Sequence, residues 1–119
     1  MTFECRVVSD VHVLTPRKNL VGGDETTALT HAVAEIAALP VPRVVLDLHR
    51  INWVSSLGIA GLTRINRACA EHDGLMRLAC VGDRIENVLL TMRLHWVFDT
   101  FDSVEEALEL PPSTVVSPH

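Results

Sequence analysis

Two adjacent serines, Ser55 and Ser56, have the side chains and the position in this chain that are best suited to chemistry. They follow a strand-like run that ends near Leu48, and they come directly before Leu57, Gly58 and a second apolar run. A hydroxyl at the start of a helix can cap it by accepting a hydrogen bond from a backbone N–H group. The partial positive charge at the same point also stabilises a phosphoserine or a bound anion. The pair therefore predicts either a helix cap or a phospho-acceptor, and Ser56 and Ser55 are the candidate acceptors.

Other reactive residue types are present, but none is arranged as a catalytic or ligand-binding motif. The serines are not in a Gly-x-Ser-x-Gly turn, and the sequence places no histidine or carboxylate to activate them. Gly22 and Gly23 lack the lysine of a phosphate-binding loop, and the six histidines and three cysteines form no zinc-ligand pair. We therefore expect no catalytic residue, no metal site and no cofactor. We expect Cys5, Cys69 and Cys80 to be small buried apolar groups.

Composition and charge exclude several classes of protein. A length of 119 residues, with 48% hydrophobic residues, suits one globular domain. The net charge of −5 argues against a nucleic-acid-binding surface, which would be basic. The chain has no apolar run of roughly 18 residues, so we expect no membrane insertion. Its first residues lack the basic start and long apolar run of a signal peptide, which predicts a cytoplasmic protein.

The hydrophobic pattern alternates between strand-like and helix-like segments. Strand-like runs occur at 43–48, 75–81, 96–101 and 5–16, the last being one strand or a hairpin that turns at Ser9 and Asp10. Helical periodicity occurs at 26–39, 57–72, 84–94 and 102–110. This alternation predicts a single α/β domain over residues 1–110, with a mixed, mostly parallel sheet of four to five strands and about four helices. Residues 111–119 are predicted to form a loose C-terminal tail.

Residue types at the ends of these segments predict how the helices start and stop. Besides the serine pair, helix caps are predicted at Asp24 or Thr26, at Asp83, and at Asp102 or Ser103. Gly74 is expected to end the second helix in the left-handed conformation. On the third helix, Met92 is expected to face the core together with Ile85, Val88 and Leu89.

The order and spacing of several motifs resembles a STAS domain, the fold of bacterial anti-sigma factor antagonists. The resemblance covers residues 5–110, nearly the whole chain. Its parts are Leu46-Asp47-Leu48 at the end of a strand, Ser55 to Gly58 at the start of a helix, Gly74 before the next strand, the 83–94 helix, and Glu105 to Leu108 in the last helix. No single part is specific, but their order implies the same α/β fold.

The resemblance implies a role in signalling. In such antagonists a partner anti-sigma kinase phosphorylates the hydroxyl residue that precedes the glycine, and the unphosphorylated domain binds the anti-sigma factor, which frees sigma. The domain itself holds no cofactor. In this chain Gly58 matches the glycine, Leu57 stands at the acceptor position, and Ser55 and Ser56 fall on the aspartate and the first serine. Leucine cannot accept phosphate, so either Ser56 serves one residue early or phosphorylation does not switch this domain.

We therefore predict a non-enzymatic binding module whose docking face lies at the start of this helix. The predicted partner-binding residues are Asn52, Trp53, Ser55, Ser56, Leu57, Gly58 and Arg64. The sequence leaves open whether Trp53 belongs to the core or to the interface. The implied partner is an anti-sigma factor with serine kinase activity. The alternative is docking without phosphorylation, on the ATPase of an ABC transporter or on a multiprotein signalling scaffold; a homodimer also stays open.

Overall fold

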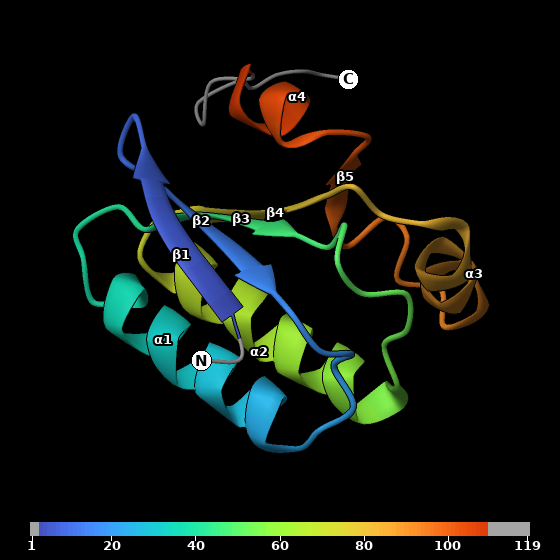
Figure 1. Cartoon of the computed structure of the whole chain (residues 1–119). Helices are drawn as coiled ribbons and strands as arrows, with labels where there is room; N and C mark the ends of the chain where they lie inside the picture. Colours follow the sequence, from blue (N-terminus) through green and yellow to red (C-terminus); the bar gives the residue numbers. More distant parts are fainter. Residues whose placement is uncertain (1–2, 110–119) are drawn as a thin grey trace.

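The computed structural model describes residues 3–109, which form a mixed sheet with helices on both of its faces (Figure 1). The described strands are β1 (Phe3–Val8), β2 (Val11–Pro16), β3 (Arg43–Asp47), β4 (Leu75–Ala79) and β5 (Asp99–Phe101). The described helices are α1 (Asp24–Ala37), α2 (Ser56–Glu71), α3 (Asp83–Thr91) and α4 (Val104–Glu109). The predicted α/β class is confirmed, with five strands and four helices in the described part of the chain. The tail predicted at 111–119 lies outside these residues.

The strands follow one another across the sheet in the order β1-β2-β3-β4-β5. β1 pairs with β2 in antiparallel fashion, and the other three pairings are parallel. The first segment is therefore a hairpin, and its two-residue turn has positive φ angles of 50° at Ser9 and 68° at Asp10. Two left-handed residues suit the twist of a hairpin, and aspartate tolerates this conformation better than most residues. The predicted turn is confirmed.

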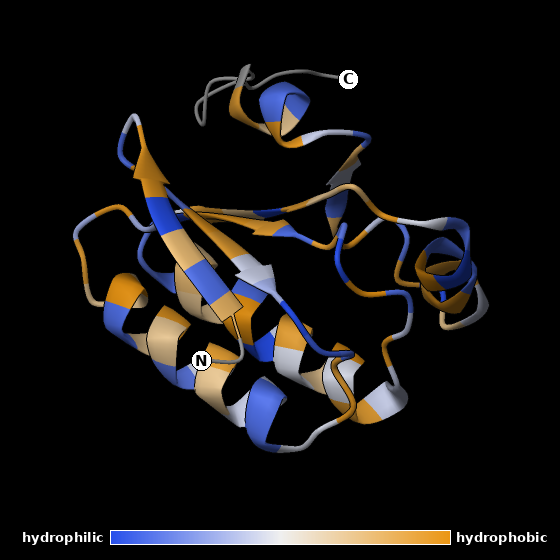
Figure 2. Cartoon of the chain, in the orientation of Figure 1, coloured by the Kyte–Doolittle hydropathy of each residue, from blue (hydrophilic) through white to orange (hydrophobic). Residues whose placement is uncertain are grey.

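Two apolar layers hold the helices onto the sheet. α1 and α2 lie on one face, and the short α4 lies on the other (Figure 1). Alternate residues of the central strands serve the two layers: Leu14, Leu46 and Leu78 pack in the cluster with α1 and α2, whereas Val45 and Ala79 pack with α4. Figure 2 shows that the strands of the sheet centre are largely apolar, as expected where both faces are covered. α3 joins the larger cluster through the buried side chains of Ile85 and Leu89.

Two of the predicted helix caps are wrong because each helix begins earlier than its aspartate would require. The N-cap residue of α1 is Gly23, and that of α3 is Gly82; neither has a side-chain cap. Asp24 and Asp83 are instead the first residues of their helices, where a carboxylate favours the positive helix end. Thr26 lies inside the first turn of α1, and its hydroxyl accepts a hydrogen bond from the Gly22 N–H across 2.9 Å.

Another cap is confirmed, and it belongs to the last helix. The Ser103 hydroxyl accepts a hydrogen bond from the Glu106 N–H across 3.1 Å, immediately before α4 begins at Val104. The β5–α4 connection can therefore be short, because a single side chain satisfies a backbone donor at the helix start.

The role predicted for Gly74 is wrong, because Asp73 adopts the left-handed conformation that ends α2, with φ of 60°. The N–H groups of Asp73 and Gly74 donate to the carbonyl oxygens of Ala70 and Cys69, in the pattern of a Schellman motif. Glycine is needed at 74 for a different reason. A Cβ atom there would collide with the carbonyl oxygen of Pro42, which accepts a hydrogen bond from Leu75 as β4 begins.

After α3 the structure differs from the sequence-based prediction because this helix ends early, at Thr91. Arg93 turns the chain with φ of 59°, and Leu94 N–H donates back to the Leu89 carbonyl across 2.8 Å. Met92, predicted to face inward, is therefore 41% exposed. β5 begins at Asp99 rather than at residue 96, and Trp96 lies in the preceding turn with 76% of its surface exposed.

The cysteines differ from one another in burial. Cys69 is buried as predicted, Cys80 is half-buried, and Cys5 is exposed, which contradicts the prediction for that residue. Cys5 lies opposite Leu14 in the β1–β2 pairing. β1 is the edge strand of the sheet, and most of its side chains are exposed, so the strand pattern alone overstated their burial.

Candidate docking site

Ser55 caps helix α2, as one of the two predictions for the serine pair required. Its backbone is extended, with φ of −82° and ψ of 176°, and its Oγ accepts a hydrogen bond from the Gly58 N–H across 3.3 Å. The Ser55 N–H donates to the Leu20 carbonyl oxygen across 2.9 Å. Both polar groups of this half-buried residue are thus held in place. Its hydroxyl is therefore already engaged within the fold.

Ser56 is placed differently from its neighbour. It is the first residue of α2, its side chain is exposed, and no hydrogen bond joins it to another described residue. It borders a pocket of about 350 Å³ that Arg64 and Arg67 of the same helix also line. An exposed hydroxyl at the positive end of a helix, with two guanidinium groups lining the same pocket, is electrostatically suited to carry a phosphate.

Leu57 and Gly58 complete the first turn in contrasting ways. Leu57 is 64% exposed and lies against Gly22. A Cβ atom added to Gly22 would come within 2.6 Å of the Leu57 Cβ. Gly58 is buried, and a Cβ atom there would collide with the Leu20 carbonyl oxygen. Leu57 therefore presents an apolar side chain to solvent. Gly58, which has no side chain, allows the turn to pack closely against the Leu20 carbonyl group.

The loop before α2 is held by a neighbouring loop that sequence reasoning did not connect with it. Asn19 Oδ1 accepts hydrogen bonds from the N–H groups of Asn52 (3.1 Å) and Trp53 (3.3 Å). Next to them, Leu20 and Val54 form a parallel β-bridge. These contacts bring a loop that follows β2 to the start of α2. They hold the backbone at Trp53 in place and so set the direction in which its side chain projects.

Trp53 lies at a pocket and is only partly buried. Its side chain is 37% exposed, and the Arg84 guanidinium lies 5.3 Å from the centre of its ring, a cation–π distance. A pocket of about 440 Å³ is lined by Trp53 and Arg84, together with Val88 and Met92. Trp53 is therefore available to a partner as an aromatic contact.

Arg64 lies further along α2 and is exposed between two pockets. One is the pocket beside Ser56, and the other, of about 260 Å³, lies between α1 and α2 and is also lined by Leu57 and His31. Ser56 and Leu57 lie at the start of α2, and Arg64, in the middle of the helix, borders a pocket with each of them. Arg67, Arg84 and Met92 were not predicted here. For Arg67, the spacing of Ser56, Thr63 and Arg67 along one helical stripe was the available signal.

A buried carboxylate lies near the end of β3, outside this surface. Asp47 Oδ1 accepts a hydrogen bond from the His49 N–H across 3.1 Å and lies 2.8 Å from its Nδ1. Burial raises the pKa of the Asp47 carboxyl, but hydrogen bonds from His49 and Cys80 outweigh burial and hold the pKa below its ordinary value. Burial and the neighbouring Asp47 charge raise the pKa of the Cys80 thiol. A protonated thiol beside an ionised carboxylate is a stable hydrogen-bonded pair and a weak nucleophile.

The described residues lack two features that other functions would require. Residues 3–109 contain no group of three or more histidine, cysteine or acidic side chains that could hold a metal ion. None of their helices combines the length and the apolar character that crossing a bilayer requires. What the described site offers is therefore an exposed surface made of hydroxyl, apolar and guanidinium groups.

Comparisons with known proteins agree with the fold and assign the family. The family model of the STAS domain matches residues 2–107. A curated relative from Thermotoga neapolitana, a TM1081 homolog assigned to the anti-sigma factor antagonists, is 23% identical over 107 residues, which are 90% of this chain and 95% of the relative.

Two solved structures show the same fold. TM1081 of Thermotoga maritima, also assigned to the anti-sigma factor antagonists, superposes with a TM-score of 0.82 at 21% identity over 90% of this chain and 92% of its own. The anti-sigma factor antagonist SpoIIAA in its unphosphorylated form superposes with a TM-score of 0.69 at 14% identity, covering 89% of this chain and 93% of its own. Because the family model spans nearly all the described residues, this chain belongs to the STAS domain family.

Proposed function

We propose that this STAS domain is an anti-sigma factor antagonist of the cytoplasm, a binding module rather than an enzyme. Its partner is an anti-sigma factor with serine kinase activity. The antagonists among its relatives support this class of partner. The docking residues are those around the start of α2, namely Asn52, Trp53, Ser55, Ser56, Leu57, Gly58 and Arg64.

The observation that carries the proposal is the difference between the two serines. Ser55 uses its hydroxyl to cap α2, whereas the Ser56 hydroxyl is exposed beside Arg64 and Arg67. Ser56 is therefore the phospho-acceptor, although Leu57 stands where the family has its acceptor. A phosphate on Ser56 would add about two negative charges to the docking face without removing the cap. The added charge and bulk would release the partner.

A second candidate function follows from Leu57. This side chain is 64% exposed at the position of the usual acceptor, and an exposed leucine suits a permanent apolar contact better than a switch. In that case the same surface docks without phosphorylation on the ATPase of an ABC transporter or on a multiprotein signalling scaffold.

Affinity capture of the tagged full chain from its native lysate separates the two candidates. Mass spectrometry identifies the partner and maps phosphate on the captured protein. We expect the captured partner to be an anti-sigma factor with a kinase domain. We expect phosphate on Ser56 of the wild-type chain and none on the S56A variant. The S56D variant should capture less of the partner than the S55A variant does. An ABC ATPase or a scaffold protein as the partner, with both serines unmodified, would overturn the phosphorylation switch and support constitutive docking.

A further inference from the structure

Three pockets of the domain are linked by residues that neighbouring pockets share. The pocket beside Trp53 and the pocket beside Ser56 share Met92. The pocket beside Ser56 and the pocket between α1 and α2 share Ala60 and Arg64. Residues from α1, α2 and α3 therefore adjoin one another across this side of the domain. We call its central part the arginine surface, which consists of Trp53, Ser56, Arg64, Arg67, Arg84 and Met92.

The arginine surface has a charge opposite to that of the whole chain. The chain carries 15 acidic residues against 10 lysines and arginines. Among the described residues that line the three pockets, however, none is aspartate or glutamate, while three are arginine and one is His31. Arg64 and Arg67 form no ion pair with another described residue. Positive charge is therefore left without an internal counter-charge here.

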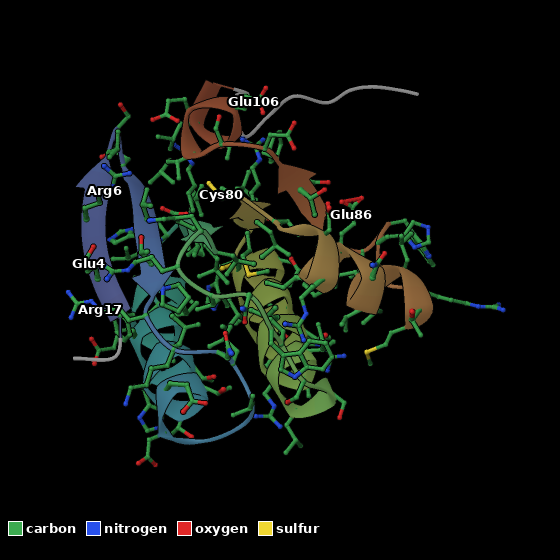
Figure 3. All side chains as sticks on the ribbon, turned by 45° about the vertical axis from the view of Figure 1, so that its right-hand side comes forward. Glu4, Arg6, Arg17, Cys80, Glu86 and Glu106 are labelled. Carbon is green, nitrogen blue, oxygen red and sulfur yellow. The ribbon has the colours of Figure 1, made fainter. Side chains whose placement is uncertain are left out.

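Glu86, one of the two acidic residues of α3, is kept away from this surface by helical geometry. Arg84, Val88 and Thr91 line the pocket beside Trp53, and they follow one stripe of the helix. Glu86 lies two residues from Arg84, which places it about 200° round the helix axis. Figure 3 shows Glu86 on the side of α3 near β5. Arg84 thus lies on the side of α3 that lines the pocket beside Trp53, and Glu86 lies on the opposite side.

A second basic cluster, made of Arg17, Lys18 and Arg50, is paired only in part, because two of its cations share one carboxylate. Arg17 Nη2 lies 2.8 Å from Glu4 Oε2, and Arg50 Nη1 lies 3.5 Å from the same oxygen. Glu4 and Arg17 lie close together beside β1 in Figure 3. Their pocket, which Lys18 and His49 also line, contains no tryptophan, phenylalanine or tyrosine among its described residues. The arginine surface differs because no described carboxylate pairs with Arg64 or Arg67, and because Trp53 and Met92 add apolar anchors.

We infer that the segment docking on the arginine surface is an acidic amphipathic stretch of the partner. Its carboxylates face Arg64 and Arg67, and an apolar side chain enters the pocket between Trp53 and Met92. Ser56 to Arg67 span about 17 Å of helix, which corresponds to roughly three turns of a partner helix. A second copy of this chain does not fit a two-fold contact here, because each arginine surface would face itself. The inference rests on the proposed function, whose partner it describes chemically.

This picture also gives phosphorylation a physical effect. A phosphate on Ser56 would place negative charge in the pocket that Arg64 and Arg67 line. Because Arg64 and Arg67 lie about 12 Å and about 17 Å further along the helix, the phosphate would act on the partner through charge rather than by direct contact with these guanidinium groups. The partner's acidic segment would meet a like charge at the Ser56 end of the surface.

Peptide titration of the purified, isotope-labelled full chain, followed by amide NMR, tests the inference. The probe is a helical peptide of alternating leucine and glutamate pairs, and its matched control has lysine in place of glutamate. We expect the acidic peptide to shift resonances of the arginine surface, the Trp53 indole included, and ~1 M salt to weaken the binding. R64E/R67E should bind roughly tenfold more weakly, whereas K18E, a charge reversal in the other basic cluster, should bind like the wild type.

Several outcomes would overturn the inference. These are equal binding of the basic peptide, shifts confined to the cluster of Arg17 and Lys18, equal loss in K18E, or no shift at millimolar peptide. The spectra of the variants report whether they are folded. An anti-sigma factor that binds R64E/R67E as well as the wild type would contradict the inference and remove Arg64 from the docking residues, while leaving the proposed antagonist role intact. Selective binding of the acidic peptide, combined with capture of an unrelated partner, would contradict the proposed function alone.

Discussion

The Leu20 carbonyl oxygen lies directly beneath Gly58 and accepts a hydrogen bond from the Ser55 N–H across 2.9 Å. One backbone oxygen of the loop that follows β2 thus determines how closely the start of α2 approaches it. The docking residues before and after Gly58 are positioned by this contact, because they share its turn.

Replacing Gly58 by alanine is therefore expected to destabilise the domain by roughly 1–3 kcal/mol, since backbone atoms on both sides must move to admit the methyl group. Gly82→Ala is the matched control. No atom lies within 4 Å of a Cβ added at Gly82, and its φ of −77° is open to alanine. We expect a change within about 0.5 kcal/mol for this variant. Urea unfolding of both variants measures the difference, and equal stabilities would show that the contact is easily relaxed.

The two serines should also differ in stability. Ser55→Ala removes the cap of α2 and should lower the free energy of unfolding by about 1 kcal/mol. Ser56→Ala removes an exposed hydroxyl that bonds to no other described residue, so the change should stay within about 0.5 kcal/mol. Chemical denaturation of both variants at the same pH makes the comparison. A larger loss for Ser56→Ala than for Ser55→Ala would contradict the assignment of cap and exposed hydroxyl.

Asp47 should make stability depend on pH at the acid end. Its pKa in the folded state lies below the unfolded value because the His49 and Cys80 hydrogen bonds outweigh burial. Its contribution is therefore fully present above the unfolded pKa, near pH 4, and is lost as pH falls through the lower folded pKa. Asp47→Asn should cost roughly 1–3 kcal/mol at pH 7 and less at pH 3. Exposed Asp73→Asn is the control, and a pH-independent cost for Asp47→Asn would be inconsistent with this account.

The cysteines should react with a thiol reagent in order of exposure and pKa. Cys5 is exposed and should react first. Burial and Asp47 raise the pKa of Cys80, and burial raises that of Cys69 to about 11, so both should react slowly until the protein unfolds. Stopped-flow labelling of the native protein should show one fast phase, which Cys5→Ser removes. A fast phase that persists in Cys5→Ser would mean that β4 or α2 opens readily.

Local patterns were sufficient for much of the fold, because they record interactions between residues close in the chain. Alternation of apolar residues located the strands, helical periodicity located the helices, and Ser55 and Ser103 were recognisable as caps. The same patterns misplaced helix starts at Asp24 and Asp83, because a cap and a first-turn carboxylate look alike in sequence. Gly74 was recognised as special, but its reason is a contact with Pro42, 32 residues away in the sequence.

The sequence by itself thus determined the α/β class, the family resemblance and the position of the serine pair at the start of a helix. It could not tell which serine hydroxyl caps the helix and which is exposed. Ser55 is positioned by a hydrogen bond to Leu20, far away in the sequence, as well as by its hydrogen bond with Gly58 of the helix. Only the tertiary structure brings Trp53, Arg64, Arg67 and Arg84 onto one surface. The physical reason is that charge and exposure at a docking face are set by how elements far apart in the chain are arranged around it, as α2 is against α1, which no local pattern encodes.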